Sequence, residues 1–518
     1  MRKYLAMLAI AFMATSFVAC DDDESTPDGP AISAPASVTN VQVGASSDVT
    51  FSLTMPGGYK SASIAAVGGT AVTKTEPAAG AKTGDLIVTY TADASTGAGT
   101  VSITVTDKND KFETETAAIN KTEIPAPEVV VVSGSINSNT TWTADKIYEL
   151  AGRVIVKDGV TLTIQAGTIV KGREGGGINA TALMIARGGK LMAEGTAAAP
   201  IIFTSVLDNI LPGEKAGTTL DEDDRGKWGG VVVLGRAPIS VSGATEAQIE
   251  GVPAGETAGL YGGDVAADNS GVIRYVSIRH GGTVLSGGSE INGLTLGGVG
   301  SGTTIENIEV FGNVDDGIEL FGGSVNLKNV MIAYQGDDAI DIDQAYSGTI
   351  DGFFVIHGGD TDEGLEIDGP EGTANATGKF TLKNGTLKGD PSKANDAASL
   401  CDFKSKAQGT VENVIFVGYP AGKKLKIAAS YDESNCTVGR ANAFSNLKSD
   451  VLVFSTVQFT GFTVSVYNSA ASSGNPGCPV PAEDQGTAES KIVSNTVSTG
   501  LPPASTWSWT ISGDKGFL

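Results

Sequence analysis

The sequence is poor in the residues that support imidazole and thiolate chemistry. Its 518 residues include only two histidines and four cysteines. Two imidazoles leave little material for a histidine-based triad or a zinc site. Four cysteines at this length do not make a disulfide-stabilised scaffold. These shortages disfavour the function classes that depend on such groups.

Charged and aromatic residues are also scarce, at 18% and 6%. Disordered chains and coiled coils need far more charge, so both are excluded. After the first 20 positions, no apolar run reaches the roughly 18 residues of a membrane-spanning helix. Glycine, in contrast, occurs 69 times without the triplet period of collagen. The composition predicts a soluble, turn-rich, all-β protein.

Acidic residues outnumber basic ones by 59 to 35, which gives a formal net charge of −24. A surface of this sign repels phosphate backbones and anionic lipid headgroups. We therefore expect no nucleic-acid partner and no direct binding to a membrane surface.

The first 19 residues have the features of a secretory signal peptide. Arg2 and Lys3 precede an apolar run, and small residues lie near its end. The sequence Phe17-Val18-Ala19-Cys20 resembles a bacterial lipobox, which implies that residues 1–19 are removed and that Cys20 carries the lipid. An ordinary secreted protein is the alternative.

Four acidic residues, Asp21 to Glu24, follow this cysteine directly. They suit a solvated, lipidated tether over residues 20–35. Cysteine followed by acidic residues also resembles the surface-export signal of Bacteroidota lipoproteins, although in other bacteria Asp at this place can mean retention at the inner membrane. We expect an outer-membrane lipoprotein that faces the cell exterior, with the lipid as its only membrane contact.

Residues 36–125 alternate apolar and polar side chains in runs separated by Gly, Asp and Asn. The clearest runs are 47–53, 86–91 and 100–106. Period-2 strands over about 90 residues are typical of a β-sandwich. We predict an immunoglobulin-like sandwich without the cysteine pair, acting as a spacer.

Residues 126–518 contain a repeat. Gly302, Gly323, Gly348, Gly378 and Gly409 each precede a strand-like segment, at intervals of 21, 25, 30 and 31 residues. Short strands that recur at this interval without helical periodicity predict a right-handed parallel β-helix with a C-terminal cap. A β-propeller is the weaker alternative. The residues expected to face inward are Leu294, Ile308, Leu327 and Phe354.

Several phrases of this region resemble one widespread family. They lie at 227–239, 249–251, 290–303 and 315–323. The residue sequences of these motifs are similar to those of secreted and lipid-anchored β-helix proteins of Bacteroidota, a family without an established activity. The resemblance runs from about Val129 to Gly369 and implies fold and location, but leaves the chemistry open.

Three successive repeats carry the same acidic element, at offsets of 22 and 25 residues. One coil per offset predicts columns of carboxylates, which repel one another unless water, shared protons or a cation offsets the charge. There are three hypotheses for these carboxylate columns: solvated turns, a calcium site, or catalysis. The candidate calcium ligands are Asp315, Asp316, Asp337, Asp338, Asp362 and Glu363.

The catalytic reading rests on a loose resemblance to pectin-cleaving β-helix glycosidases. Acidic pairs at Asp315/Asp316 and Asp337/Asp338, followed by His357-Gly358, occur in a similar order. Paired carboxylates serve such enzymes as acid and base. The substrate-binding Arg-x-Lys of that family has no clear counterpart here.

The remaining chemically notable residues are interpreted as structural. His280 ends a strand, and we expect it to be a hydrogen-bonded turn residue. Cys436 and Cys478 are candidates for a disulfide, with Cys401 buried and free. Core and end-cap packing is expected for Trp142, Trp228, Trp507 and Trp509.

The sequence thus predicts a cell-surface lipoprotein whose β-helix binds extracellular polysaccharide or protein partners, or serves a structural role. The alternative is a polysaccharide-degrading enzyme, either glycosidase or lyase, that uses Asp315, Asp316, Asp337 and Asp338. Calcium is the only cofactor considered.

Overall fold

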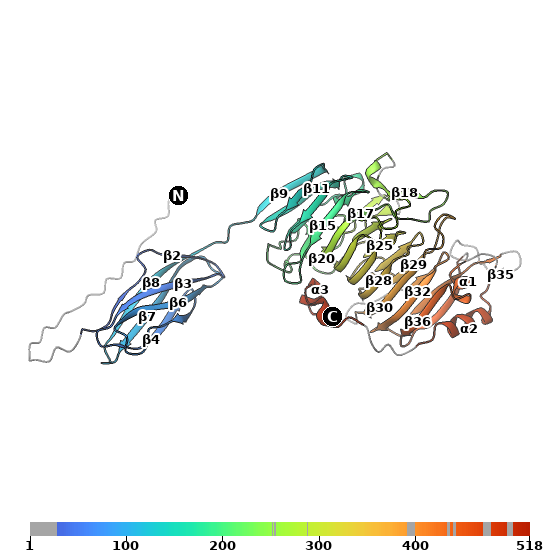
Figure 1. Cartoon of the computed structure of the whole chain (residues 1–518). Helices are drawn as coiled ribbons and strands as arrows, with labels where there is room; N and C mark the ends of the chain where they lie inside the picture. The colour runs from blue at the N-terminus through green and yellow to red at the C-terminus, as the bar shows by residue number, and fades with distance from the viewer. Residues whose placement is uncertain are drawn as a thin grey trace, which may run out of the picture. The chain divides into compact units, whose positions relative to one another are not determined.

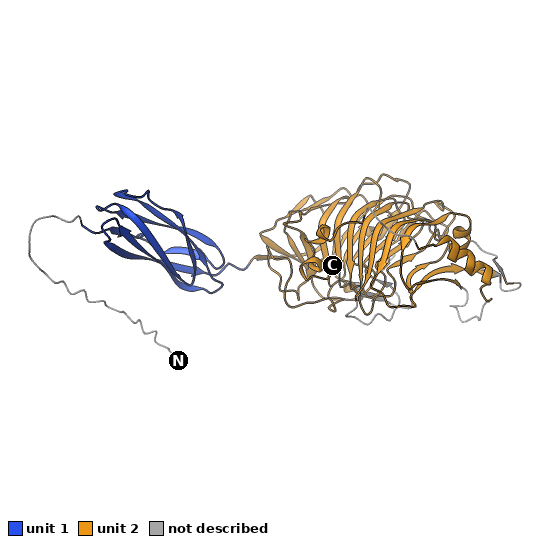
Figure 2. Cartoon of the chain, turned by 90° about the horizontal axis from the view of Figure 1, so that it is seen from below, with its two compact units in different colours: residues 1–126 blue, residues 127–518 orange. Residues whose placement is uncertain are grey.

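The computed structural model describes residues 28–250, 252, 255–286, 289–390, 399–432, 436–438, 442–469, 478–494 and 501–518. Cys20, the signal peptide and the acidic run after it lie outside these residues. The chain divides into two compact units, residues 1–126 and 127–518 (Figure 2). No described helix is long and apolar enough to cross a membrane.

The first unit contains two four-stranded sheets around a shared core. Inward side chains such as Phe51, Leu86 and Ile103 are completely buried, whereas their neighbours along each strand are exposed or partly exposed. This alternation makes a β-sandwich. Its immunoglobulin-like character stays a prediction. The first sheet contains β1 (Ala31–Ser33), β3 (Ser46–Thr54), β6 (Thr83–Ala92) and β5 (Gly69–Thr75). The second contains β2 (Thr39–Gln42), β8 (Phe112–Thr122), β7 (Gly97–Asp107) and β4 (Tyr59–Val67).

The second unit is a solenoid in which the strand pairs between coils are parallel (Figure 1). This confirms the predicted parallel β-helix and excludes the antiparallel blades of a propeller. The first coils contain β9 (Glu128–Ile136), β10 (Thr140–Trp142), β11 (Lys146–Val156), β12 (Thr161–Ile164), β13 (Ile169–Gly172), β14 (Ala182–Ile185), β15 (Lys190–Glu194) and β16 (Ile201–Ser205).

Two series of strands then run along the solenoid. The short series is β17 (Val231–Leu234), β23 (Leu294–Gly297), β25 (Ile318–Phe321), β27 (Ile340–Asp343), β29 (Leu365–Ile367), β31 (Ser399–Phe403), β33 (Lys424–Ala429) and β37 (Thr463–Asn468). The long series is β20 (Gly271–Arg279), β24 (Thr304–Phe311), β26 (Asn326–Ala333), β28 (Thr349–His357), β30 (Phe380–Gly389), β32 (Gly409–Val417) and β36 (Leu452–Gln458).

Each long strand bends at a residue with positive φ. Asn307, Asn329 and Asn413 have φ values of 55°, 54° and 55°, and Gly352 has 78°. Asn and Gly adopt this conformation at least cost. The amide of Asn329 also donates to Oδ1 of Asn307 at 3.1 Å. The bend therefore stacks regularly from coil to coil.

The core runs through all of these coils. Leu294, Ile308 and Leu327 are buried in it, as predicted. The prediction for Phe354 was wrong, because the bend at Gly352 changes which alternate residues point inward. Phe353 fills the core in register with Ile308 and Val330, while Phe354 lies on the outer side.

Smaller elements decorate the solenoid. They are the hairpins β18 (Glu246–Gln248)/β19 (Leu260–Gly262), β21 (Val284–Ser286)/β22 (Ser289–Glu290) and β34 (Tyr431–Asp432)/β35 (Thr437–Val438). The α-helices are α1 (Ala443–Lys448), α2 (Ala482–Lys491) and α3 (Ile511–Asp514), and the 3₁₀ turns include η1 (Gly177–Asn179), η2 (Thr257–Gly259) and η4 (Ala504–Trp507).

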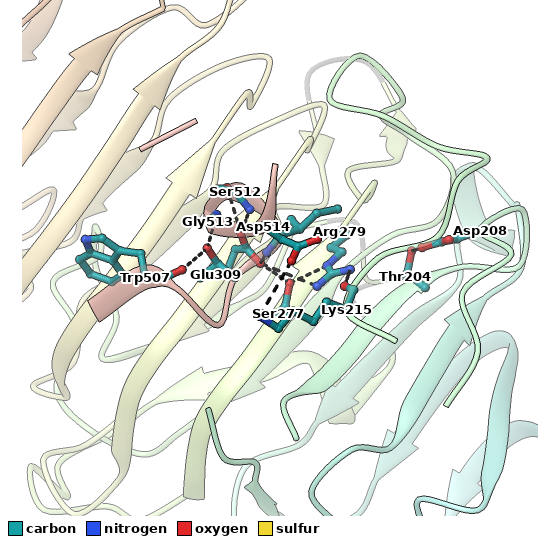
Figure 3. Close-up of polar contacts among 12 residues, drawn as sticks. Thr204, Asp208, Lys215, Ser277, Arg279, Glu309, Trp507, Ser512, Gly513 and Asp514 are labelled. Carbon is teal, nitrogen blue, oxygen red and sulfur yellow. Dashed lines mark hydrogen bonds and ion pairs between the residues drawn. The ribbon is translucent and has the colours of Figure 1, made fainter. Parts of the chain in front are cut away.

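The last described segment, residues 501–518, returns to the middle coils and covers the outer side of the long strands (Figure 1). Its anchor is Glu309 of β24, which is completely buried. The Glu309 carboxylate accepts hydrogen bonds from the backbone N–H of Ile511 and Ser512 at 3.0 Å each, and from the hydroxyls of Ser512 and Ser277 (Figure 3). Arg279 Nη2 lies 4.0 Å away.

The predictions for the cysteines and for His280 are confirmed. Cys436 and Cys478 form a disulfide, and Cys401 is buried and free. His280 is buried, and its Nδ1 lies 2.8 Å from the carbonyl oxygen of Asp224. All four tryptophans are buried; Trp507 and Trp509, however, pack against the side of the solenoid and not at its end.

Candidate functional site

The inner acidic column forms a hydrogen-bonded ladder between coils. Asn292 Oδ1 accepts from the backbone N–H of Asp316 at 3.2 Å, and Asp316 Oδ1 accepts from that of Asp338 at 3.0 Å. Asp338 Oδ1 then accepts from the N–H of Glu363 at 2.7 Å. All four side chains are buried. Asn292, Asp316 and Asp338 therefore satisfy backbone donors at the turns, whereas the Glu363 carboxylate accepts from the Ser399 hydroxyl and pairs with Lys426.

The outer column is different. Asp315 is partly buried, and Asp337 and Asp362 are exposed. Although Asp362 reaches the surface, partial desolvation of its carboxyl group, followed by the Glu363 carboxylate, raises its pKa to about 6. The six predicted ligands thus lie in two columns. Only the outer column, formed by Asp315, Asp337 and Asp362, reaches water.

Three further carboxylates complete the cluster; they belong to the repeated acidic element but were not among the candidate ligands. Glu319, Asp341 and Glu366 lie in register on β25, β27 and β29. Each lies between two apolar residues that point into the core, so each points outward. This alternation was the signal that could have found them. Asp343, two residues after Asp341 on β27, lies on the same side of that strand. We call Glu319, Asp341, Asp343 and Glu366 the acidic face.

Oxygen atoms of these groups approach one another closely. One oxygen each of Asp316, Glu319 and Asp341 lie within 4.8 Å of one another, and the same holds for Asp338, Glu363 and Glu366. A third such group is Asp315, Asp316 and Asp337. Hard cations such as calcium take carboxylate oxygens as ligands, so the geometry of each group suits one.

The electrostatics differ between the first two groups. Burial, and then the Glu319 carboxylate, raise the pKa of Asp316 well above its ordinary value. Burial, and then the Asp341 carboxylate, do the same for Glu319. For Asp341, burial and then Asp343 raise the pKa. In the described part of the chain, no lysine or arginine forms an ion pair with these three residues.

Lysines balance the second group. Lys426 Nζ lies 3.0 Å from Glu363 Oε1 and 3.0 Å from Asp402 Oδ2, and Lys404 pairs with Glu366. Burial alone would lower the pKa of Lys404, but Glu366 and neighbouring carboxylates raise it above its ordinary value. Charge at this end of the acidic face is therefore compensated by the protein itself.

One atom marks the uncompensated end. Asp341 Oδ1 is buried and has no hydrogen-bond partner among the described residues. A buried polar atom without a partner costs about 1–3 kcal/mol, and more when charged. A proton or a cation beside it would remove this cost.

Two of the four residues suggested for catalysis already accept backbone hydrogen bonds. Asp316 and Asp338 are engaged in the ladder, and neither is among the described residues that line the cavities of about 410, 370 and 210 Å³. His357 is completely buried, 5.2 Å from Tyr419. Burial and then Lys423 lower its pKa to about 3, so it is neutral at ordinary pH.

Comparisons with known proteins place the fold. No curated protein matches the sequence. A Yersinia enterocolitica family 28 exopolygalacturonase is similar over 85% of this chain and 86% of its own, with 10% identity and a TM-score of 0.17, which is too low to support an argument about function. The sequence profile of the pectate-lyase-like β-helix domain matches residues 134–509. Because this match covers well over half of the sequence, the chain belongs to the pectate-lyase-like β-helix family.

Proposed function

We propose that this protein is a lipid-anchored outer-membrane protein, facing the cell exterior, whose β-helix binds extracellular polysaccharide at the acidic face with the help of calcium. The observation that carries the proposal is the uncompensated group of Asp316, Glu319 and Asp341, with its buried, unpartnered oxygen. A cation bound there would supply the positive charge that Lys404 and Lys426 supply in the following coils.

Calcium suits this group better than a transition metal. The available ligands are carboxylate oxygens, with no histidine or cysteine among the three residues, and oxygen-only sites favour hard cations. Calcium takes six to eight oxygens. Three carboxylates would leave positions for water or for the hydroxyl and carboxylate groups of a sugar.

The same argument explains why a polysaccharide would need the ion. A chain with a formal charge of −24 repels acidic glycans. A bound divalent cation reverses the local sign and bridges protein carboxylates to those of the sugar. The pectate-lyase-like family to which the chain belongs supports a carbohydrate ligand.

The N-terminal parts fit this location. Cys20 would carry the lipid, residues 21–35 would form a hydrated tether, and the sandwich, proposed to be immunoglobulin-like, would hold the solenoid away from the membrane. Replacing Cys20 by Ala should move the protein from the membrane fraction to the soluble fraction. Continued membrane association of Cys20→Ala would contradict the anchoring.

The binding test compares glycan arrays with calcium and with EDTA. We expect binding only with calcium, and loss of binding in the double variant Glu319→Gln/Asp341→Asn. Glu412→Gln, an exposed substitution on β32, is the matched control and should bind as the wild type does. Glycan binding that persists in EDTA would contradict the role of calcium.

A glycosidase or lyase that uses Asp315, Asp316, Asp337 and Asp338 is the second candidate. Family membership favours it, whereas the use of Asp316 and Asp338 in the ladder disfavours it. Incubating the wild type with acidic polysaccharides and measuring new reducing ends and unsaturated products decides between them. Turnover that disappears in Asp337→Asn would favour the enzyme.

A further inference from the structure

A second polar site lies on the first coils, away from the acidic residues discussed so far. It is a cavity of about 410 Å³ at the carboxyl ends of β11, β14 and β17, walled on one side by the β18–β19 hairpin and η2. This volume falls within the range of about 300–1,000 Å³ typical of small-molecule sites. Its charged lining residues are Lys157, Asp158, Arg187, Arg236, Glu246 and Asp264.

The lining is balanced in charge. It contains three cationic and three acidic side chains, on a chain whose net charge is −24. Two cross-wall ion pairs organise four of them: Arg187 Nη1 lies 2.7 Å from Glu246 Oε1, and Arg236 Nη2 lies 2.9 Å from Asp158 Oδ2. A cation or an anion would each be repelled by half of this lining.

The wall is held in place before any ligand arrives. Arg187 Nη1 donates to the carbonyl oxygen of Gly262 at 3.0 Å as well as to Glu246. Glu246 and Gly262 are paired across the hairpin, so one guanidinium fixes both of its strands. Beneath it, Leu234 and Tyr261 belong to a buried apolar cluster. Preorganisation of this kind reduces the entropic cost of binding.

We infer that this cavity binds a neutral saccharide unit. Sugar hydroxyls both donate and accept hydrogen bonds, and rows of guanidinium and carboxylate groups offer acceptors beside donors. Hydrogen bonds to such charged groups are stronger than those between neutral groups. Val265, which is 46% exposed, and Ala258 supply apolar contact for the C–H groups of a sugar ring.

This site is independent of the proposed calcium site. None of its lining residues belongs to the ladder or to the acidic face. Binding here should therefore persist in EDTA and in Glu319→Gln/Asp341→Asn. Failure of the acidic-face proposal would leave this inference standing, and the reverse also holds.

The test titrates the full chain in EDTA with methyl glucoside, methyl galactoside, methyl mannoside and sodium glucuronate, by isothermal calorimetry. We expect at least one neutral glycoside to bind at a single site. Arg236→Ala should weaken it about tenfold, the loss expected for one hydrogen bond to a charged group. Arg236 is 43% exposed, so the variant should fold.

Two further variants make the result decisive. Asp264→Asn removes an acceptor charge without changing size and should also weaken binding, whereas Lys190→Ala, an exposed change on β15, should not. Absence of binding by all three neutral glycosides would overturn the inference, as would unchanged affinity in Arg236→Ala. Glucuronate binding about tenfold more tightly than every neutral glycoside would assign the site to an anion instead.

Discussion

Buried carboxylates have opposite surroundings on the two outer sides of the β-helix that are formed by the long and by the short strands. On the long strands, Glu309 is covered by residues 501–518 and meets four hydrogen-bond donors (Figure 3). On the short strands, Glu319 and Asp341 are packed beside other carboxylates, and Asp341 Oδ1 has no partner among the described residues.

The comparison separates a structural carboxylate from one suited to a ligand. A buried charge persists only when donors or counter-ions compensate it. The C-terminal segment brings donors to Glu309, and Lys404 and Lys426 compensate Glu366 and Glu363. In the coil between them, Asp316 and Glu319 accept hydrogen bonds from the Asp338 N–H and the Asn292 amide. Among the described residues no lysine or arginine forms an ion pair with this group, and Asp341 Oδ1 has no hydrogen-bond partner. That shortage of positive charge is what points to a cation.

The largest expected effect comes from breaking the compensated side. Glu309→Ala leaves the backbone N–H groups of Ile511 and Ser512 without their acceptor and removes the ion-pair partner of the buried Arg279. Such losses cost about 3–5 kcal/mol. Tryptophan fluorescence during denaturant unfolding measures this in the β-helix alone, because all four tryptophans lie after residue 126. Glu412→Ala is the exposed control and should change the unfolding free energy little.

Detachment of residues 501–518 from the long strands offers a second measurement on Glu309→Ala. Loosened packing of residues 501–518 should make the C-terminus a preferred site of limited proteolysis. Wild-type stability together with a protected tail in Glu309→Ala would contradict the anchoring role of this carboxylate.

Calcium should give the next largest effect, on the uncompensated side. A ligand that binds only the folded state stabilises it by about 2.7 kcal/mol at 100 times its dissociation constant. Fluorescence-monitored melts with calcium and with EDTA measure this difference. It should vanish in Glu319→Gln/Asp341→Asn and persist in Glu412→Gln. If the wild-type melting curves with calcium and with EDTA coincide, the acidic face consists of protonated or hydrated carboxylates and binds no calcium.

Much of this architecture was predictable because it is periodic. Glycines at regular intervals indicated the coils, and the offsets of 22 and 25 residues indicated the carboxylate columns. Periodicity fails where the phase changes. Gly352, with φ of 78°, shifts the alternation by one residue, so Phe353 and not Phe354 enters the core.

Long-range packing was not predictable in the same way. Glu309 lies between the core residues Ile308 and Val310, so alternation is consistent with its outer position. Nothing near it in sequence, however, indicates that residues some 200 positions later bury it. Likewise, the acidic motifs gave no means of telling Asp315, in a turn that reaches water, from Asp316 in the buried ladder. Burial depends on which coil or segment covers a side chain.

A smaller effect should distinguish charge from hydrogen bonding within the ladder. Asp338→Ala removes the acceptor for the Glu363 N–H and should cost about 1–3 kcal/mol. Asp338→Asn keeps an Oδ1 acceptor, as Asn292 does one coil before Asp316. It also removes an ionisable carboxyl group, whose pKa is raised by burial and then by Glu366. In EDTA it should match or exceed wild-type stability. Equal destabilisation by Asn and Ala would show that the ladder needs a carboxylate.

The smallest expected effect is the pH dependence of the calcium-free β-helix. Asp316, Glu319 and Asp341 have pKa values raised by burial and neighbouring carboxylates, and that of Asp362 is raised to about 6. The folded state therefore holds protons that the unfolded state, with pKa values of about 4, has released. Stability from this source is complete below about pH 4 and falls as pH rises through 6 and above. Each unit of net pKa difference corresponds to about 1.4 kcal/mol.

The sandwich should show no such fall, because the hydrogen bond from Lys121 and that from Ser95 lower the pKa of Asp93 to about 2. Its contribution is present above about pH 4 and is lost as pH falls toward 2. Melts of the two units between about pH 4.5 and 7.5 in EDTA, followed by tryptophan fluorescence for the β-helix and circular dichroism for the whole chain, compare them directly. Glu319→Gln/Asp341→Asn should flatten the β-helix profile while the sandwich stays unchanged. A wild-type β-helix whose stability rises across this range would mean that its acidic face is already compensated without calcium.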